Sequence, residues 1–591
     1  MDRRFVVVAA IASLALALLP APDSANATPN CTASPRLSGS FIQPDLVDSW
    51  TNTQIANEDT KLKNACITTQ ILQWTADSKN HTATYDTGLT GYTWNTSTDV
   101  PDRLLSHAES AGIDAYVGLQ INDDWWTKYA DDTTWLSKEA TFSEQLADEV
   151  YANYGPYDSF AGWYLPFEVD NDHFQTTTEQ DNLARFYATV IGYLHSTFGR
   201  PVVISPFFNA NLGGALDPSG WQTMWTRILD DLGSTAPDVI ALQDGVGAGH
   251  ATSAQLGAWF SATRSAISTA GVSTSLYDDA ETYQLGPSGF QPMPIGPVVT
   301  DMSAVSASVA GYWSFSYDHY QSPLSTFANS AYHNSYLNYL ANGTVESTAP
   351  TTPGPPSANA VDSQTVSLSW TASTDAVGVA GYDIYRNGQL VAATNGTGTG
   401  FTDTQLDAST SYTYTVKAFD GAGNTSSASS SASATTPAGP SYGTNWSLGK
   451  TYTASVAADA SYPDTGGTEL TDGVLAATPT YVAAWQGRNS VGTYSFTIDL
   501  GASHAIKSLN STWLQVRSDF VFLPNSVTYA VSTDGTSYTT VGTINRPAID
   551  SSDQIKTYRL IGLNVTGRYV RITVDGGTAW SMVDEAQALT T

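Results

Sequence analysis

The chain has 591 residues, and its 55 Asp and Glu residues against 24 Lys and Arg residues give a formal net charge of −31. This length is too great for a single hydrophobic core, so we expect several domains. A surface this acidic disfavours contacts with phosphate groups, so neither nucleic acid nor an anionic membrane is an expected partner.

The N-terminus has the pattern of a secretory signal peptide, which we assign to residues 1–27. Arg3 and Arg4 precede an apolar stretch at 5–19 and the small-residue cleavage motif Ala-Asn-Ala at 25–27. No later apolar run approaches the length of a membrane-spanning helix. These features predict a secreted, extracellular protein.

The chain has two cysteines, Cys31 and Cys66, both near the start of the first predicted domain. In an exported chain such a pair is expected to form a disulfide. A zinc site would need further ligands close by.

Residues 36–343 alternate apolar strand-like runs with amphipathic helical runs, which predicts a closed (β/α)8 barrel of the TIM type. The predicted strands are 37–43, 67–74, 114–121, 160–167, 201–208, 239–243, 274–277 and 310–315. The predicted helices are 53–64, 101–111, 141–153, 180–198, 220–232, 254–270 and 324–340. The helix after the third strand and the connection after the seventh are longer than the minimum, which indicates a cleft rim.

A Pro- and Thr-rich stretch at 344–356 is typical of a semi-stiff linker. The all-β segment 357–437 follows, with the motifs VSLSW at 366–370 and GYDIYRNG at 381–388, and with Tyr412 six positions after Leu406. These motifs resemble a fibronectin type III domain. The resemblance implies that Trp370 is a core residue and Tyr412 the tyrosine of the corner motif, so we expect a spacer without chemistry.

The last segment, 442–591, is also rich in strand-like runs. Its motifs are ELTDG at 469–473, YSFTIDLG at 494–501, VSTDG at 531–535 and GRYVRI at 567–572. They resemble the discoidin-like domain of coagulation factors and of many bacterial carbohydrate-binding modules, a β-sandwich of the jelly-roll type. The resemblance implies sugar binding, for which Trp485, Trp513 and Trp580 are candidates.

The same resemblance implies a structural calcium ion in this last domain. Asp472 and Glu585 are the expected carboxylate ligands, with Asp464 as a further candidate, and oxygen-rich turns of this kind suit calcium. The alternative is that Asp472 only closes its Asp-Gly turn.

Four barrel segments, LSGSFIQP at 37–44, QILQW at 70–74, GWYLPFE at 162–168 and ALQDGVG at 241–247, resemble a largely uncharacterised bacterial family of glycoside-hydrolase-like barrels. In the broader clan of retaining glycosidases, the acid/base lies at the end of the fourth strand and the nucleophile at the end of the seventh. Carried over, Glu168 is the acid/base and Glu281 the nucleophile. The clan has Asn before the first glutamate where this chain has Phe167, so the sugar 2-hydroxyl contact falls to Asn209 or Asn171.

The residue types suit this chemistry, because glycoside hydrolysis needs a proton donor and a second carboxylate facing one cleft. Apolar neighbours of Glu168 favour its protonated form. Its alternative role is a structural ion pair, and Asp278, Asp279 or Asp244 can replace Glu281. The other expected substrate contacts are Trp74, Trp125, Trp163, Asn209, Asp244, Tyr283, Trp313 and Asp318.

We therefore expect a secreted glycoside hydrolase, acting as a monomer on a polysaccharide or oligosaccharide and needing no catalytic cofactor. No H-E-x-x-H, G-x-S-x-G or phosphate-loop motif is present in the sequence. Two alternatives stay open. One is a binding protein with a degenerate barrel, and the other is a polysaccharide lyase, which the scarcity of Lys and Arg disfavours.

Overall fold

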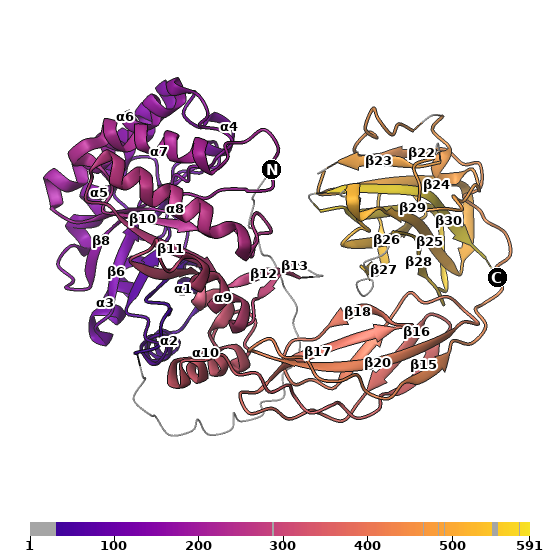
Figure 1. Cartoon of the computed structure of the whole chain (residues 1–591). Coiled ribbons are helices and arrows are strands. Elements are labelled where there is room, and N and C mark those ends of the chain that lie inside the picture. Colours follow the sequence, from indigo (N-terminus) through magenta and orange to yellow (C-terminus); the bar gives the residue numbers. More distant parts are fainter. Residues whose placement is uncertain are drawn as a thin grey trace.

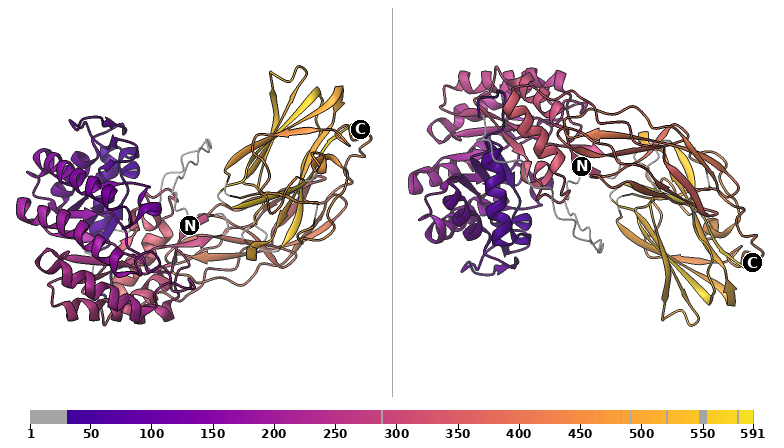
Figure 2. Two further views of the ribbon diagram at one scale, coloured as in Figure 1. Left: turned by 90° about the horizontal axis from the view of Figure 1, so that it is seen from above. Right: turned by 90° about the horizontal axis from the view of Figure 1, so that it is seen from below.

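The computed structural model describes residues 31–590 apart from 287–288, 465, 483, 490, 520, 547–552 and 578. The predicted signal peptide, 1–27, lies outside the described residues. An α/β domain is followed by two all-β domains, which form an arc in Figure 1 and in the turned views of Figure 2.

The N-terminal domain is a parallel eight-stranded barrel, as the sequence predicts. Its two end strands, β1 and β14, meet where Ser38 N donates to Tyr312 O at 2.7 Å. The strands in sheet order are β1 (Gly39–Ile42), β2 (Thr69–Leu72), β6 (Asp114–Gly118), β8 (Phe160–Leu165), β9 (Val202–Ile204), β10 (Val239–Gln243), β11 (Ser275–Glu281) and β14 (Gly311–Phe315).

Helices pack around the outside of this barrel (Figure 1). They are α1 (Pro44–Ser49), α2 (Asn52–Asn64), α3 (Val100–Ala111), α4 (Trp125–Lys128), α5 (Thr133–Tyr154), α6 (Thr177–Phe198), α7 (Pro218–Leu232), α8 (Ser253–Ala270), α9 (Ile295–Val305) and α10 (Ser330–Asn342). The sequence analysis missed α9, because Gly296 and Pro297 in its first turn are poor helix formers inside a long connection. Capping residues fix the ends of other helices: Thr176 and Glu179 form a capping box at the start of α6, and Gly199 ends it in the left-handed conformation.

Additional elements extend the rim at the carboxyl ends of the strands. A small sheet contains β3 (Ala76–Asp77), β4 (Thr82–Ala83), β5 (Thr93–Trp94) and β7 (Gln120–Ile121). The connection after β11 holds a hairpin of β12 (Tyr283–Gly286) and β13 (Gly289–Pro292), and a π-helical turn, η2 (Tyr317–Gln321), follows β14. The additional chain length that was predicted after the seventh strand therefore forms the β12–β13 hairpin and α9.

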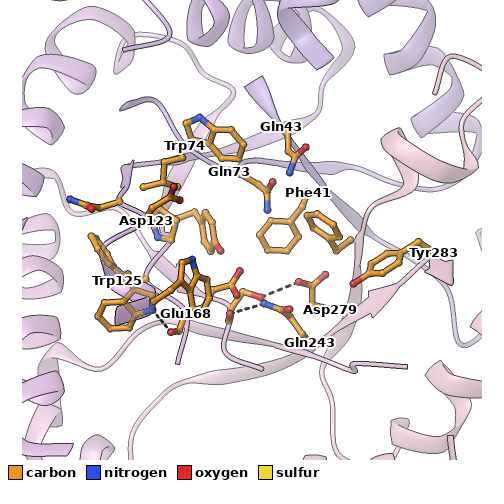
Figure 3. Close-up of a pocket in the computed structure, with 18 residues that line it drawn as sticks. Phe41, Gln43, Gln73, Trp74, Asp123, Trp125, Glu168, Gln243, Asp279 and Tyr283 are labelled. Carbon is orange, nitrogen blue, oxygen red and sulfur yellow. Dashed lines mark hydrogen bonds between the residues drawn. The ribbon is translucent and has the colours of Figure 1, made fainter. Parts of the chain in front are cut away.

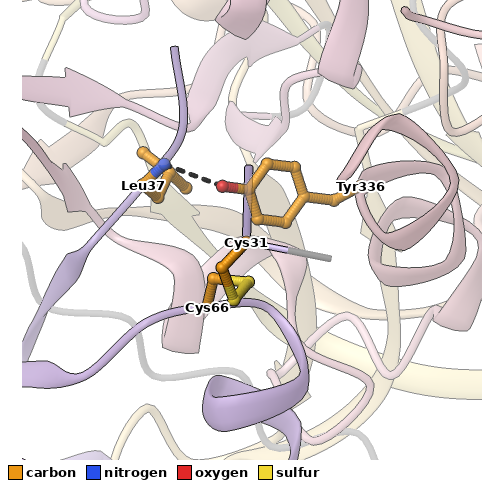
Figure 4. The surroundings of a disulfide bond; sticks show 4 residues. All are labelled: Cys31, Leu37, Cys66 and Tyr336. Carbon is orange, nitrogen blue, oxygen red and sulfur yellow. Dashed lines mark hydrogen bonds between the residues drawn. A yellow bond between two sulfur atoms is a disulfide. The ribbon is translucent and has the colours of Figure 1, made fainter. Parts of the chain in front are cut away.

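The disulfide between Cys31 and Cys66 joins the N-terminal arm to the end of α2 (Figure 4). Next to it, Leu37 N donates to the Tyr336 hydroxyl at 2.7 Å, so the arm also contacts α10. These contacts connect the first and last parts of the barrel.

The middle domain packs a three-stranded sheet against a four-stranded one. The first contains β15 (Ser357–Asp362), β16 (Thr365–Ser369) and β19 (Gly400–Asp403), and the second β17 (Val379–Arg386), β18 (Gln389–Ala393), β20 (Ser411–Asp420) and β21 (Ala432–Thr435). Trp370 and Tyr412 are buried between the sheets.

The C-terminal domain is also a two-sheet sandwich. Its five-stranded sheet contains β22 (Tyr452–Ala454), β24 (Thr493–Ile506), β26 (Ser526–Ser532), β27 (Thr539–Asn545) and β29 (Val565–Asp575), and its four-stranded sheet β23 (Gln486–Asn489), β25 (Ser508–Gln515), β28 (Gln554–Leu560) and β30 (Trp580–Leu589). In the described part of the chain, no helix has the length and apolar character to cross a membrane.

The middle domain is docked directly on the barrel. Ile295 N donates to Gly421 O at 2.9 Å and Asn329 Nδ2 donates to Ala380 O at 2.7 Å. Gly421 packs so closely that a Cβ atom there would lie 2.3 Å from the Ala331 carbonyl oxygen. The domain is therefore packed against α9 and α10 as well as spacing the C-terminal domain from the barrel.

Replacing Gly421 with Leu should destabilise this junction, because the side chain has no space against Ala331. We expect a loss of about 1–3 kcal/mol in the free energy of unfolding, the usual cost of overpacking. Gly398→Leu is the matched control, since an added Cβ there has no neighbour within 4 Å. Calorimetry showing equal melting temperatures for the two variants would contradict the docking.

Candidate active site

A cavity of about 370 Å³ opens at the carboxyl ends of the barrel strands (Figure 3). Catalytic sites of this fold are assembled at this end of the barrel. Its lining is mostly aromatic and polar: Phe41, Gln43, Gln73, Trp74, Ile121, Asn122, Asp123, Trp125, Trp126, Tyr164, Pro166, Phe167, Glu168, Ser205, Gln243, Asp279, Tyr283 and Phe315.

Glu168 and Asp279 face this cavity from different strands. Glu168 follows β8 and is half-buried, whereas Asp279 lies within β11 and is buried. Side chains alternate along a strand, so Asp279 shares the barrel-interior side with Tyr277, which packs against the interior core. Figure 3 shows the two carboxylates directed toward the same space.

Asp279 is held by neighbours from β9 and β10. Ser205 Oγ donates to Asp279 Oδ2 at 3.0 Å, and Gln243 Nε2 donates to Ser205 O at 3.1 Å. Burial, and after it the charges of Asp278, Glu281 and Glu168, keep the pKa of Asp279 well above its usual value, although the Ser205 hydrogen bond opposes the shift. The group at this position therefore favours holding a proton.

The segment that carries Glu168 is fixed by aromatic packing. Trp125 Nε1 donates to the Glu168 carbonyl oxygen at 2.7 Å, and the Tyr187 hydroxyl donates to Phe167 O at 2.8 Å. The Phe167 ring packs edge-on against Trp125 and Phe186. Phe167 thus supports the backbone before Glu168 and places an apolar ring where the related clan has Asn.

Glu281, the expected nucleophile, ends β11 but does not line the cavity. It is 2% exposed, and its Oε2 atom accepts a hydrogen bond from Ala248 N at 2.6 Å. The loop after β10 therefore packs on Glu281. Asp279, an alternative in the sequence analysis, is the β11 carboxylate that reaches the cavity.

Other acidic residues lie behind the cavity wall. Asp244, Asp278 and Asp301 are buried, and their pKa values are raised, first by burial; the charges of nearby carboxylates raise those of Asp244 and Asp278 further. Neither carboxylate oxygen of Asp278 has a hydrogen-bond partner among the described residues. Still, no group of three or more His, Cys, Asp and Glu residues in the described ranges is arranged to hold a metal ion.

The expected aromatic contacts divide into two groups. Trp74, Trp125 and Tyr283 line the cavity. Trp163 packs among Tyr151, Phe160 and Phe198 on the helix side of β8, and Trp313 is buried inside the barrel below the cavity. Trp163 and Trp313 are therefore core residues in this structure.

The expected polar contacts also lie away from the lining. Asn209 N donates to Asn171 Oδ1 at 2.9 Å, so this pair holds the loop after β9. Asp244 caps its own turn by accepting from Val246 N. Asp318 is fully buried, and its carboxyl group lies close enough to that of Glu58 on α2 for their charges to interact.

Several lining residues were missed by the sequence analysis: Gln43, Gln73, Asn122, Asp123, Ser205 and Gln243. Each lies at or just after a barrel strand or the short β7. These residues could have been found in the sequence by looking for polar residues at the carboxyl end of each predicted strand.

In the C-terminal domain, Asp472 and Glu585 lie at one turn. Glu585 Oε2 accepts from Gly473 N at 3.0 Å, and Asp584 Oδ2 accepts from Ala476 N at 2.7 Å. Burial, and then the charges of Asp472 and Asp584, raise the pKa of Glu585 to about 8. The second oxygens of Asp584 and Glu585 are buried without a hydrogen-bond partner among the described residues.

The Glu58–Asp318 pair should make the barrel less stable as the pH rises. Burial raises the pKa of Asp318 to about 6, above an unfolded value of about 3.9. The contribution of this group to stability is complete below the unfolded value and is lost as the pH rises through about 6. Asp318→Asn should therefore flatten the fall in melting temperature across this range, whereas Asn at the exposed Asp131 should not. Equal slopes in both variants, measured by calorimetry, would contradict this assignment.

Comparisons with known proteins identify two domains. Residues 37–326 match a domain of unknown function, DUF4434, and residues 451–586 match the F5/8 type C domain. Among curated proteins, exoglucanase B of Cellulomonas fimi is 50% identical over 98 residues, 17% of this chain and 9% of that protein. Chitinase Chi52 of Paenibacillus xylanexedens is 48% identical over 110 residues, 18% of this chain and 21% of that protein. The chain thus spans less than a quarter of either relative.

Similar solved structures have low overall scores against the whole chain. A putative alpha-L-fucosidase from Bacteroides thetaiotaomicron has a TM-score of 0.45 and 21% identity, and covers 54% of this chain and 99% of its own. Chitosan-binding module 1 of a Paenibacillus chitosanase/glucanase has a TM-score of 0.19 and 21% identity, and covers 25% of this chain and all of its own. By the family matches, the chain contains a DUF4434 domain in its barrel and an F5/8 type C domain at its C-terminal end.

Proposed function

We propose that this protein is a secreted glycoside hydrolase that cleaves a polysaccharide or oligosaccharide with Glu168 and Asp279. The observation that supports this most directly is that the two carboxylates enter one aromatic-lined cavity from the fourth and seventh barrel strands. Paired carboxylates facing one cleft are the chemical requirement for glycoside hydrolysis.

The two groups suit different roles. Glu168 is the more exposed, so it can exchange its proton with water and serve as the acid/base. Asp279 is fixed by Ser205 and is proposed as the nucleophile of a retaining mechanism. Burial favours the protonated form of Asp279, so a nucleophilic role requires that this proton lie on Glu168 when the bond is cleaved.

The cavity lining contains no Lys, Arg or His residue. A polysaccharide lyase has to stabilise extra negative charge next to a uronic acid carboxylate, which the carboxylates Asp123, Glu168 and Asp279 oppose. The lining therefore favours a hydrolase acting on an uncharged sugar unit.

Flat rings at the cavity suit sugar binding. Trp74, Trp125 and Tyr283 present surfaces on which the apolar face of a pyranose can stack. The names of the two relatives, an exoglucanase and a chitinase, agree with a polysaccharide as the substrate class.

We assign accessory roles to the two β-domains. The middle domain is proposed to be of the fibronectin type III kind, since its sheets have three and four strands and the Tyr412 hydroxyl accepts from Asp407 N at 2.9 Å. The C-terminal domain is proposed to bind sugar. Trp485 and Trp513 are buried there, whereas Trp580 is partly exposed beside Tyr462, which leaves Trp580 as the aromatic candidate.

Two further proposals concern the protein as a whole. The signal-peptide pattern at 1–27 supports export, and we propose that the protein acts as a monomer. We also propose the structural calcium ion that the discoidin resemblance implies, at the turn of Asp472 and Glu585; backbone oxygens would have to complete its ligands, because no three acidic side chains of the described residues are grouped for a metal.

Substitution of the carboxylates tests the proposed pair. Glu168→Gln and Asp279→Asn should each lower kcat/KM by at least about a hundredfold, measured as release of reducing ends from a polysaccharide panel. Glu281→Gln is the matched control, with an expected loss below about tenfold, because Glu281 contacts Ala248 N outside the cavity. If Asp279→Asn remained active and Glu281→Gln lost its activity, Glu281 and not Asp279 would be the nucleophile. If the protein bound the polymer but did not cleave it, the alternative of a carbohydrate-binding protein with a degenerate barrel would be favoured.

The calcium proposal predicts a metal-dependent melting temperature. Free calcium at about 100 times Kd should stabilise the C-terminal domain by about 2.7 kcal/mol, and a chelator should remove this effect. Glu585→Gln should abolish the calcium shift, with magnesium as the control ion. A melting temperature that does not respond to calcium would overturn the site.

A further inference from the structure

A second pocket, of about 330 Å³, lies where the middle domain meets the C-terminal domain. Its volume is within the usual range for small-molecule sites. Residues of both domains line it: Arg386, Asn387, Gln389, Leu406, Asp407, Tyr412, Gln554, Ile555, Lys556, Thr557 and Arg559.

This pocket has the opposite charge to the rest of the protein. Three cationic residues, Arg386, Lys556 and Arg559, line it together with the carboxylate of Asp407, and a second carboxylate, that of Asp403, pairs with Arg386. The whole chain has only 24 Lys and Arg residues against 55 Asp and Glu. A local excess of positive charge on such an acidic protein attracts anions to this place and not to the barrel cavity.

The two arginines already have carboxylate partners. Arg386 Nη1 lies 2.9 Å from Asp403 Oδ1, and Arg559 Nη1 lies 3.4 Å from Asp407 Oδ1. Arg386 also lies over the Tyr412 ring at 5.8 Å, which fixes its orientation. These contacts orient the two guanidinium groups at the pocket.

Lys556 differs, because no carboxylate of the described residues lies within salt-bridge distance of its ammonium group. Burial lowers the pKa of Lys556 to about 8; the nearby charge of Asp407 opposes this shift, as does that of Asp403, whereas the charges of Arg386 and Arg559 add to it. A partly buried ammonium group without an ion-pair partner is unfavourable, and an anion in the pocket would relieve this cost.

Both domains hold the pocket in shape. Gln405 of the middle domain accepts from Arg559 N at 2.9 Å and donates to Arg559 O at 3.5 Å. The backbone of β28, the strand that carries Lys556, is therefore hydrogen-bonded to the middle domain at Arg559. The amide side chains of Gln389 and Gln554 add neutral hydrogen-bonding groups to the lining.

We propose that this interdomain pocket binds an acidic sugar unit, with its carboxylate at Lys556 and Arg559 and its hydroxyl groups at the glutamine amides. The site is separate from the barrel cavity, and its occupation does not depend on the proposed hydrolase activity. It would give the protein a second point of attachment on a polymer that carries uronic acid units.

Calorimetric titration of the full chain with tetragalacturonate at low salt tests this site. We expect binding that weakens as salt is added, with cellotetraose, the uncharged comparison, binding more weakly at this site. Lys556→Gln should weaken tetragalacturonate binding by at least about tenfold, and Lys556→Arg should retain it. Lys507→Gln is the control, because Lys507 is partly buried, donates to Asn564 Oδ1 and is not among the residues that line this pocket.

The proposal would be overturned by equal binding of cellotetraose and tetragalacturonate, by unchanged tetragalacturonate binding in Lys556→Gln, or by the absence of any tetragalacturonate binding. If inorganic sulfate competes as strongly as the sugar acid, the pocket recognises charge alone and the sugar assignment fails. Reducing-end release should be unchanged in Lys556→Gln, which separates this test from that of the barrel.

Discussion

The closure of eight parallel strands is the constraint on which the proposed site depends. Ser38 and Tyr312 join the first and last strands, so residues at the carboxyl ends of β8 and β11 face the same cavity although they are far apart in the sequence. The interior core of Phe41, Tyr164 and Trp313 fills the barrel below this level, so the cavity has a closed floor. Asp279 faces the cavity because side chains alternate along β11 and every second one points into the barrel.

Buried carboxylates are the main energetic cost of this arrangement. Asp279 at the cavity and Asp244 and Asp278 behind it have raised pKa values because burial and mutual repulsion disfavour their charged forms. Large aromatic residues around Glu168 and tight docking of the middle domain on α9 and α10 offset part of that cost. Buried carboxylates with perturbed pKa values of this kind are common at functional sites.

Much of the fold was predictable from the sequence, because strand and helix periods in the barrel are strong and regular. The prediction of β10 at 239–243 matches the structure, and Glu168 lines the cavity at the carboxyl ends of the strands. The choice between Asp279 and Glu281 was not predictable, since both lie on the same side of β11 and only the loop after β10 separates them. Asp318 and Trp163 were unpredictable for a similar reason: strand-end position alone does not show whether a side chain faces the cavity or a neighbouring helix.

We propose that Asp279 forms the covalent bond to the sugar while Glu168 transfers the proton. It is tested most directly by mass spectrometry of the protein after reaction with a 2-fluoro glycoside of the sugar that it cleaves, because such a reagent accumulates the glycosyl–enzyme intermediate of a retaining mechanism. The account predicts one sugar adduct on the peptide containing Asp279, at that residue. An adduct at Glu281 or Glu168, or an active protein that forms no adduct, would contradict it.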